Sequence, residues 1–279
     1  MPLPSDGVTA SHRGGSGEPL VLLHGINGSW RIWRPVIAAL EADHDVFAPT
    51  LPGHAGGPAL GPEAPVSIDV LADGVEQILD AAGLETAHFA GNSLGGWLAI
   101  ELARRGRGRS VVAFSPAGGW RADRDLRRVI RLLSGARAVL AHREALGLDD
   151  LIRRPGFRRL AFRQAMERGD LIPAVEALDL IADADGCSAY DGFVRWIRGT
   201  QPMASFRDGL PCRVRLAWSE HDRTIPFHRY GQPILDALAG AEHVTVRGVG
   251  HVPMYDDPQR VVKTILQVTN SENREEEQT

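Results

Sequence analysis

Short apolar runs alternate with helical apolar patterns along most of this chain, and this alternation restricts the possible folds more than any other feature. The runs expected to form strands cover residues 20–23, 46–48, 86–90, 110–114, 213–218 and 243–246. Between them, apolar residues recur at helical spacing, for example at Ile68, Leu71, Val75 and Leu79, with Gly83 in the position of a C-terminal cap. Strands that alternate with helices usually form a parallel sheet covered on both faces. The sequence therefore predicts an α/β fold with a mostly parallel central sheet.

The alternation stops in the middle of the chain. From residue 120 to residue 206 strand-like runs are absent, arginine is frequent, and apolar residues such as Val129, Leu133 and Leu140 have helical spacing. We expect this segment to be an inserted all-helical cap, with residues 1–119 and 207–270 forming the core. Residues 271–279 carry four glutamates and one arginine and are expected to be a disordered acidic tail.

The composition and charge of the chain limit the kinds of molecule that it can be expected to bind. The chain has 279 residues and a formal net charge of −4, of which the acidic tail supplies −3, so the remaining chain is nearly neutral. Such a balance gives no reason to expect nucleic acid as a partner. The apolar runs are too short to cross a bilayer, and residues 1–17 lack the apolar core of a secretory signal.

The cysteines and histidines show no spacing typical of a disulfide or a metal site. Cys187 and Cys212 are far apart and show no C-x-x-C spacing, and the ten histidines have no metal-ligand spacing. We therefore expect no disulfide, no metal and no cofactor, and a cytoplasmic location. The oligomeric state does not follow from the sequence.

The strongest local motif is Gly91-x-Ser93-x-Gly95, placed between an expected strand and an expected helix. A nucleophile on a tight strand-to-helix turn needs small neighbours two residues away on each side, and both glycines meet this need. The helix N-terminus favours a developing anion at Ser93. The simpler alternative is a glycine-rich turn with a capping serine.

An oxyanion needs two backbone donors near this turn. We expect Leu94, which follows the nucleophile, to supply one N–H group. Ile26 should supply the other, because it lies in the glycine loop after the first buried strand. His24 in the same loop is expected to be a structural hydrogen-bonding residue.

A serine nucleophile also needs a base and an acid on later loops. His251 follows the last expected strand and is the predicted base. Asp222 follows the preceding strand and is the predicted acid, with Glu220 as its nearest rival. Asp256 and Asp257 are better explained as helix-start residues.

Together these segments resemble the α/β-hydrolase superfamily. The resemblance rests on Leu23-His24-Gly25, Leu51-Pro52-Gly53-His54, Gly91 to Gly96, the loop with Asp222 and Pro226, and Gly250-His251. It implies an α/β-hydrolase fold in which Ser93, Asp222 and His251 form a catalytic triad. Ser93 distinguishes the chain from the epoxide hydrolases and haloalkane dehalogenases that it also resembles, because those carry aspartate at this position.

The resemblance implies a carboxylesterase-like serine hydrolase that acts on a small acyl or ester substrate through an acyl-enzyme. Trp30, Asn92 and Val252 are the expected substrate-binding residues. The elbow is similar to that of meta-cleavage-product hydrolases, so carbon–carbon bond hydrolysis is an alternative, although Val252 stands where those enzymes carry tryptophan. A non-catalytic ligand-binding protein of the same fold is the second alternative.

Overall fold

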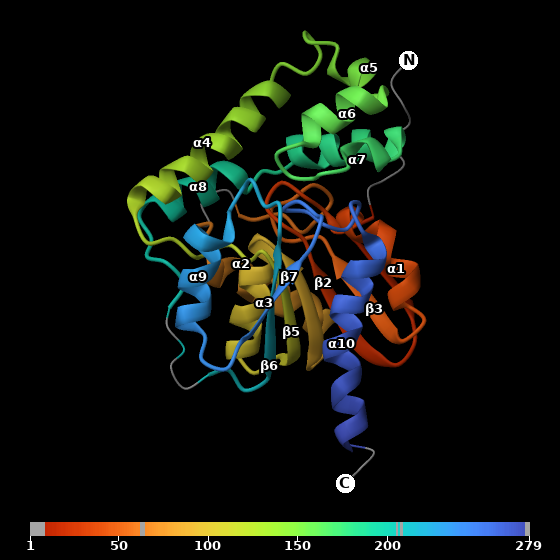
Figure 1. Cartoon of the computed structure of the whole chain (residues 1–279), viewed down its shortest axis with the longest axis vertical. Helices are drawn as coiled ribbons and strands as arrows, with labels where there is room; N and C mark the ends of the chain where they lie inside the picture. Colours follow the sequence, from red (N-terminus) through yellow and green to blue (C-terminus); the bar gives the residue numbers. More distant parts are fainter. Residues whose placement is uncertain (1–8, 62–64, 205, 207–208, 277–279) are drawn as a thin grey trace.

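A seven-stranded sheet forms the centre of the molecule in the computed structural model, which describes residues 9–61, 65–204, 206 and 209–276 (Figure 1). The strands are β1 (Ser11–Gly15), β2 (Glu18–Leu23), β3 (His44–Pro49), β4 (Ala87–Asn92), β5 (Gly108–Phe114), β6 (Arg213–Ser219) and β7 (Glu242–Val246). Their spatial order is β1-β3-β2-β4-β5-β6-β7. Only β1 runs antiparallel to its neighbour, β3. The predicted α/β fold with a mostly parallel sheet is confirmed.

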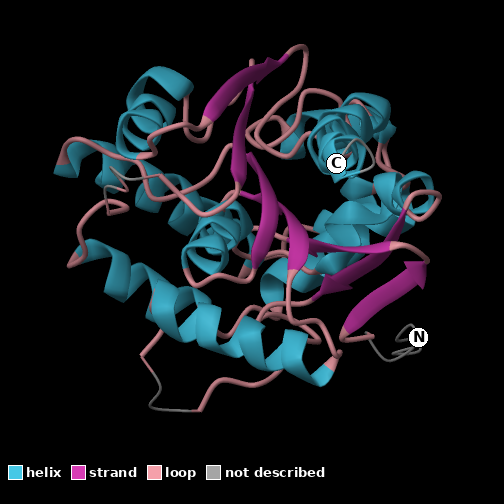
Figure 2. Cartoon of the chain, turned by 90° about the horizontal axis from the view of Figure 1, so that it is seen from below, coloured by secondary structure: helices cyan, strands magenta, loops and turns pink. Residues whose placement is uncertain are grey.

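Helices cover both faces of this sheet (Figure 2). In the core they are η1 (Trp30–Trp33), α1 (Arg34–Leu40), α2 (Ile68–Ala81), α3 (Leu94–Arg104), α9 (Phe227–Ala237) and α10 (Pro258–Glu276). Buried residues of α2, α3 and α9 belong to one apolar cluster, and those of α1 and α10 belong to another. The sheet therefore separates two hydrophobic cores.

The side chains of β2 illustrate how one strand serves both cores. Val21 and Leu23 lie in the first cluster, whereas Leu20 and Leu22 lie in the second, and all four are completely buried. Successive side chains of a strand point to opposite faces of a sheet. A strand covered on both faces consequently reads as a continuous apolar run in the sequence.

Local capping groups set the ends of several helices. The Ser67 hydroxyl accepts a hydrogen bond from the Val70 amide at the start of α2, and Gly83, with φ of +73°, follows its last turn. The Asp257 carboxylate accepts from the Arg260 amide at the start of α10. These side chains satisfy backbone N–H groups that have no partner within the helix, and the glycine adopts a left-handed conformation at little cost.

The first strand was not expected from the sequence. Residues Ser11–Gly15 pair antiparallel with β3, from Ser11 opposite Pro49 to Gly15 opposite Asp45. The segment contains no apolar side chain, so it has no alternating pattern that would predict a strand. Backbone hydrogen bonds to β3 hold it there, together with contacts of His12 with Glu41 and of Arg13 with Asp45.

A group of helices between β5 and β6 lies above the sheet (Figure 1). It comprises α4 (Asp123–Leu140), α5 (Leu148–Ile152), α6 (Pro155–Phe162), η2 (Gly169–Leu171), α7 (Ala174–Asp185) and α8 (Tyr190–Arg198). We call the helices α4 to α8 the cap. The expected boundary at residue 207 lies outside the described residues.

A hydrogen bond and several ion pairs connect cap helix α7 to the core. The Ser29 hydroxyl donates to Asp183 at 2.5 Å, and the Arg34 guanidinium lies 2.6 Å from Asp179. Arg31 lies 3.2 Å from Asp179 and 3.6 Å from Asp183. Asp183 and Arg31 are both buried, and buried charges persist in proteins when they are paired in this way.

The segment from residue 271, expected to be a disordered acidic tail, begins within helix α10. Helix α10 continues through Glu276, and residues 277–279 lie outside the described part of the chain. The segment 271–276 contains neither glycine nor proline, and each residue added to an existing helix gains a backbone hydrogen bond without a new nucleation step.

Candidate active site

Ser93 occupies the tight turn between β4 and α3. Its φ of +55° and ψ of −113° are unusual for a residue with a side chain. Its amide donates to Phe114 O, and its carbonyl accepts from the amides of Trp97 and Ala117. These three bonds hold the strained backbone in place, as expected when strain is maintained at a functional position.

The two glycines of the motif are required by close packing. A methyl group on Gly91 would overlap the carbonyl of Gly95, and one on Gly95 would overlap the carbonyl of Leu23. The strand, the turn and the helix can therefore approach each other only because these positions lack side chains. This is the steric reason for small residues around Ser93 that the sequence predicts.

The structure brings the predicted base and acid together. His251 Nδ1 lies 2.7 Å from Asp222 Oδ2, and both residues are buried. The other carboxylate oxygen of Asp222 accepts from the amides of Thr224 and Ile225 at 2.9 and 2.7 Å. The rival residue, Glu220, instead accepts from the Gly248 amide and is exposed. Asp222 is thus the carboxylate positioned to orient His251.

Asn92, the last residue of β4, connects the turn to the histidine loop. Its side-chain amide donates to His251 O at 2.9 Å and to Phe114 O at 3.2 Å. Asn92 therefore fixes the backbone of the base relative to the turn with Ser93, in addition to lining the cavity described below.

The loop after β2 lies against Ser93. A methyl group on Gly25 would come within 3.2 Å of the Ser93 Cβ atom. The amides of Ile26 and Leu94 donate to no backbone carbonyl of the described residues in a turn, loop or cap. Both residues line the same cavity as Ser93. The two residues expected to supply oxyanion donors therefore lie at the same cavity as the serine.

His24 supports this loop as a structural residue. Its Nε2 atom accepts from the Leu51 amide at 2.9 Å, and Nδ1 lies 2.8 Å from Gly25 O. The His54 ring lies 5.0 Å away, centroid to centroid. Burial lowers the pKa of His24 well below its usual value and lowers the pKa of His54 to about 4. Both imidazoles are therefore neutral in the folded protein at neutral pH.

The neutral state of His54 makes stability depend on pH. The unfolded chain binds a proton at His54 below about pH 6.5, whereas the folded protein does so only near pH 4. The free energy of unfolding should therefore fall between these values, with His54 contributing about 3 kcal/mol. Urea unfolding of the wild type and His54→Asn at pH 7 and pH 4.5 measures this contribution. Equal losses in both proteins would contradict it.

Ser93 and His251 face an internal cavity of about 560 Å³. The walls are apolar residues of the cap and of the loops that follow the strands, with polar side chains at Asn92, Ser93, Gln164, Thr224 and His251. Val252, which the sequence analysis expects to bind substrate, also lines it. No charged side chain of the described residues contributes to the lining.

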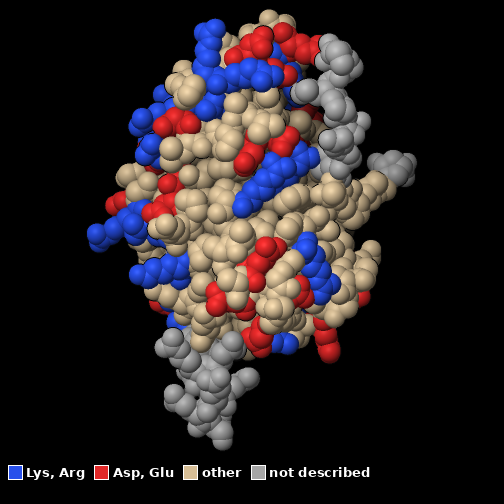
Figure 3. Space-filling model, turned by 90° about the vertical axis from the view of Figure 1, so that its right-hand side faces the viewer, with Lys and Arg blue, Asp and Glu red and all other residues tan. Residues whose placement is uncertain are grey.

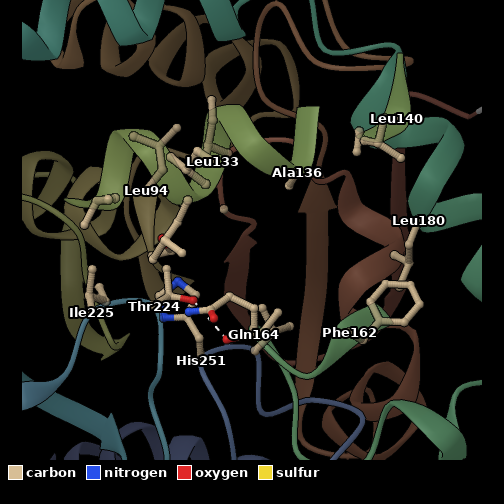
Figure 4. Close-up of a pocket in the computed structure, with 18 of the residues that line it drawn as sticks. Leu94, Leu133, Ala136, Leu140, Phe162, Gln164, Leu180, Thr224, Ile225 and His251 are labelled. Carbon is tan, nitrogen blue, oxygen red and sulfur yellow. Dashed lines mark hydrogen bonds between the residues drawn. The ribbon is translucent and has the colours of Figure 1, made fainter. Parts of the chain in front are cut away.

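The cavity extends along cap helix α4. One side of this helix lines the cavity with an apolar stripe made of Leu126, Ile130, Leu133, Ala136 and Leu140. From Leu126 to Leu140 the stripe is about 21 Å long, at 1.5 Å per residue. Ile225 and Leu94 lie near the catalytic end in Figure 4, and Leu140, Leu180 and Phe162 lie at the opposite end. The space is therefore elongated and suited to an apolar chain.

The prediction that Trp30 forms a wall of the site is wrong. Trp30 does not line the cavity among the described residues; its indole nitrogen donates to Thr9 O, and its ring stacks on His12 of β1. The Arg34 guanidinium covers the ring as well. The edge strand that the sequence did not reveal therefore holds this tryptophan away from the site.

Asp256 was expected to cap the start of a helix, but its side chain instead binds amides of two loops. Its carboxylate accepts from the Gly250 amide and from the cap amides of Glu167 and Arg168, at 2.7 to 2.9 Å. Burial raises its pKa, and these amides partly offset that effect. Asp256 thus joins the cap to the loop of His251, a long-range contact for which the sequence carries no local signal.

Three further properties bear on possible ligands. Among the described residues no group of three or more His, Cys, Asp or Glu residues could hold a metal ion. In the same part of the chain, no helix combines the length and apolarity that spanning a membrane requires. Acidic and basic side chains are interspersed on the face drawn in Figure 3, so that face has no large region of one charge.

Comparison with known proteins agrees with this geometry. Residues 20–264 match the model of the alpha/beta hydrolase family. The epoxide hydrolase EphH of Mycobacterium tuberculosis is 38% identical over 206 residues, which cover 72% of this chain and 94% of that protein. The 2-hydroxymuconate semialdehyde hydrolase of a Pseudomonas species is 36% identical over 117 residues, which cover 39% of this chain and 40% of that protein.

Solved structures show the same fold at lower identity. An esterase from Thermogutta terrifontis aligns with a TM-score of 0.70 and 18% identity, covering 94% of this chain and 93% of that one. The meta-cleavage product hydrolase CumD of Pseudomonas fluorescens aligns with a TM-score of 0.69 and 21% identity, covering 94% of this chain and 93% of that one. With its sheet order, its turn at Ser93 and the match over residues 20–264, the chain belongs to the alpha/beta hydrolase family and is a hydrolase.

Proposed function

We propose that this protein is a serine hydrolase that cleaves carboxylic esters of apolar acids through an acyl-enzyme intermediate. One observation carries the proposal: Ser93, on a strained turn, opens into an apolar cavity together with His251, whose Nδ1 atom is hydrogen-bonded to Asp222. This is the arrangement in which a serine hydroxyl becomes a nucleophile, with a base to take its proton and an acid to orient the base.

The proposed reaction proceeds in two halves. Ser93 Oγ attacks the ester carbonyl while His251 Nε2 takes its proton, and the N–H groups of Ile26 and Leu94 stabilise the oxyanion. The protonated imidazole then gives this proton to the departing alkoxide, which leaves as an alcohol. Water, deprotonated by His251, attacks the acyl-enzyme, and the acid is released as Ser93 recovers its proton.

The lining of the cavity supports a neutral, apolar substrate. Moving a charged group from water into an apolar site without a partner costs several kcal/mol or more. No charged side chain of the described residues lines this cavity, and the arginines of the cap lie outside its lining. An ester with an extended apolar acyl chain therefore fits better than an anionic substrate.

Epoxide hydrolysis does not follow from the relative of that name. If Ser93 opened an epoxide, the covalent product would be an ether, which activated water does not cleave. An aspartate nucleophile would give an ester, which water can hydrolyse. The chemistry of a serine at this position favours carbonyl substrates.

Carbon–carbon bond hydrolysis is a second candidate, favoured by the similarity to a 2-hydroxymuconate semialdehyde hydrolase. The same triad could act on a ketone. A muconate-type substrate carries a carboxylate, however, and the lining offers no cationic side chain among the described residues. Ester hydrolysis remains the better-supported proposal.

A series of p-nitrophenyl esters from acetate to palmitate tests the proposal. We expect kcat/KM to rise about fourfold for each added methylene until the cavity is filled, because burial of one methylene contributes about 0.8 kcal/mol. Leu180→Trp, at the far end, should move the plateau to shorter chains. Leu171→Trp makes the same change at an exposed cap residue and should not move it. A flat series in the wild type would contradict the proposal.

A further inference from the structure

Several arginines of the cap, unlike most arginines of the core, have no acidic partner. Residues 124–163, from α4 through α6, carry eleven arginines and four acidic residues, a formal charge of +7 in a chain whose net charge is −4. In the core, arginines such as Arg13, Arg105 and Arg215 lie 2.6 to 3.0 Å from carboxylates. In the described part of the chain, no carboxylate lies within ion-pair distance of six exposed arginines of this segment, namely Arg124, Arg127, Arg131, Arg154, Arg159 and Arg163. Their charge is therefore available to an external partner.

The unpaired arginines of α4 lie on one exposed face of that helix. Arg124, Arg127 and Arg131 follow each other at intervals of three and four residues, and residues with this spacing are neighbours on a helix surface. The apolar stripe that lines the cavity occupies a different face of the helix. Arg159 and Arg163, at the end of α6, also have a spacing of four and are exposed. Each of the two helices thus presents positive charge to the solvent.

Apolar side chains are exposed in the same segment. Val139, Leu146 and Leu160 have exposed fractions of 49%, 53% and 57%. The other large apolar residues that are exposed in the described chain, Leu171 and Val175, also belong to the cap. Such residues usually occur singly over a protein surface, and their concentration in one region is typical of an interaction surface.

The cavity reaches the surface beside these residues. Ala136 and Val139 of α4 and Ala161 of α6 line the cavity, and all three are exposed. We call these three residues the cavity mouth. Leu160 precedes Ala161 in the chain and extends the apolar surface outward. Figure 1 shows α4 and α6 at the end of the molecule opposite the C-terminus, so an apolar mouth lies there between two helices that carry unpaired arginines.

A surface with both basic and apolar side chains matches the boundary of an anionic bilayer. Arginines attract anionic headgroups, while leucine and valine side chains enter the adjoining acyl region. A free anion would pair with the arginines but would leave the apolar side chains in water. An acidic protein has the same charge as an anionic bilayer, but only the bilayer also supplies acyl chains at the apolar mouth. Binding of this kind takes place on the bilayer surface and needs no membrane-spanning helix.

We propose that the outer side of α4 and α6, with the cavity mouth between them, docks on anionic lipid bilayers. The docking itself does not depend on the proposed ester hydrolysis. If that proposal holds as well, the docked bilayer supplies the ester, because esters with long apolar chains collect in lipid rather than in water. The acyl chain then passes from the lipid into the apolar mouth without crossing water.

Sedimentation with lipid vesicles tests the docking. Ser93→Ala serves as the parent protein, so that turnover does not alter the lipid, and the vesicles contain phosphatidylcholine alone or an equal mixture with phosphatidylglycerol. We expect the parent to bind the anionic vesicles at least about tenfold more strongly than the neutral ones. Arg124→Gln/Arg127→Gln/Arg131→Gln should weaken this binding roughly 100-fold, because each arginine near an anionic leaflet strengthens it about fivefold. Leu160→Ser should weaken it about tenfold through the loss of apolar contact.

The control with the same change in charge is Arg104→Gln/Arg109→Gln/Arg213→Gln. These exposed arginines lie at the end of α3 and near the starts of β5 and β6, at the end of the sheet opposite the Ser93 turn. We expect the binding of this control to remain within about threefold of the parent, because charges far from the bilayer are screened by salt. Thermal unfolding midpoints close to that of the parent show that each variant is folded.

Equal binding to neutral and anionic vesicles, or no binding to either, would overturn the proposal, and so would unchanged binding in the folded α4 variant. Retention on a heparin column without vesicle binding would also overturn it and would indicate an acidic macromolecule as the partner. Raising sodium chloride from about 0.1 M to about 0.5 M should release the parent from anionic vesicles, a check that needs no substitution. If the wild type hydrolyses no ester, the proposed function fails, whereas the vesicle experiment still decides the docking.

Discussion

Ser93→Ala should reduce ester turnover by roughly 10⁴- to 10⁶-fold, because no other group can form the acyl-enzyme. The fold should be retained. Alanine also carries a Cβ atom, so the strain at φ of +55° is unchanged, and the three backbone hydrogen bonds of the turn do not involve the hydroxyl. Steady-state hydrolysis of a p-nitrophenyl ester and the thermal unfolding midpoint measure the two effects.

The matched control for this variant is Ser188→Ala. Ser188 lies in the cap outside the cavity lining, and its hydroxyl donates to Gly53 O. The same atom is removed, but we expect turnover within about threefold of the wild type, as a single hydrogen bond outside the site contributes about 1 kcal/mol to stability. Ester hydrolysis by Ser93→Ala at the wild-type rate would remove Ser93 from the mechanism.

Asp222→Asn should lower kcat by about 10⁴-fold while changing the fold little. The side-chain oxygen can still accept from the amides of Thr224 and Ile225, so the amide NH₂ group then faces His251 Nδ1. An NH₂ group at that position favours the tautomer with the proton on Nε2. In this form His251 cannot take the proton of Ser93, and the nucleophile stays inactive.

Glu220→Gln is the control for the acid, because Glu220 lies two residues away, accepts from the Gly248 amide and makes no hydrogen bond or ion pair with His251. We expect it to retain most of the turnover. If instead Glu220→Gln lost activity and Asp222→Asn kept it within tenfold, the carboxylate that supports His251 during the reaction would not be Asp222. Kinetics of both variants at saturating ester distinguish these results.

Local sequence patterns were sufficient to predict most of the strands and helices of the fold. The six parallel strands follow from apolar runs, and Gly83 and Asp257 mark helix ends through capping rules that depend on nearby residues only. The edge strand β1 lacks such a pattern, since its position depends on backbone hydrogen bonds to β3 and on polar side-chain contacts with residues distant in the sequence. Local rules therefore miss elements that a neighbouring strand stabilises.

In the site, too, local patterns predict some residues, whereas the positions of others depend on long-range contacts. Ser93, Asp222 and His251 were found because each follows a strand whose carboxyl end lies on the same side of a parallel sheet. The error at Trp30 comes from β1, which the tryptophan contacts instead of the cavity. Cavity-lining cap residues such as Leu180 and Phe162 were not singled out, because their positions depend on how the cap packs on the core. Sequence reasoning thus identified the serine, aspartate and histidine that the proposed mechanism uses, and it left the residues of the cavity wall undetermined.

The most direct test of the central claim is labelling of the purified protein with a fluorophosphonate probe, followed by peptide mass spectrometry. Fluorophosphonates modify serines that are activated by a neighbouring base. The account predicts modification at Ser93 in the wild type and its loss in His251→Ala, with both proteins folded. Absence of label on folded wild type, or equal labelling in His251→Ala, would contradict an activated Ser93 and would favour a ligand-binding protein of the same fold.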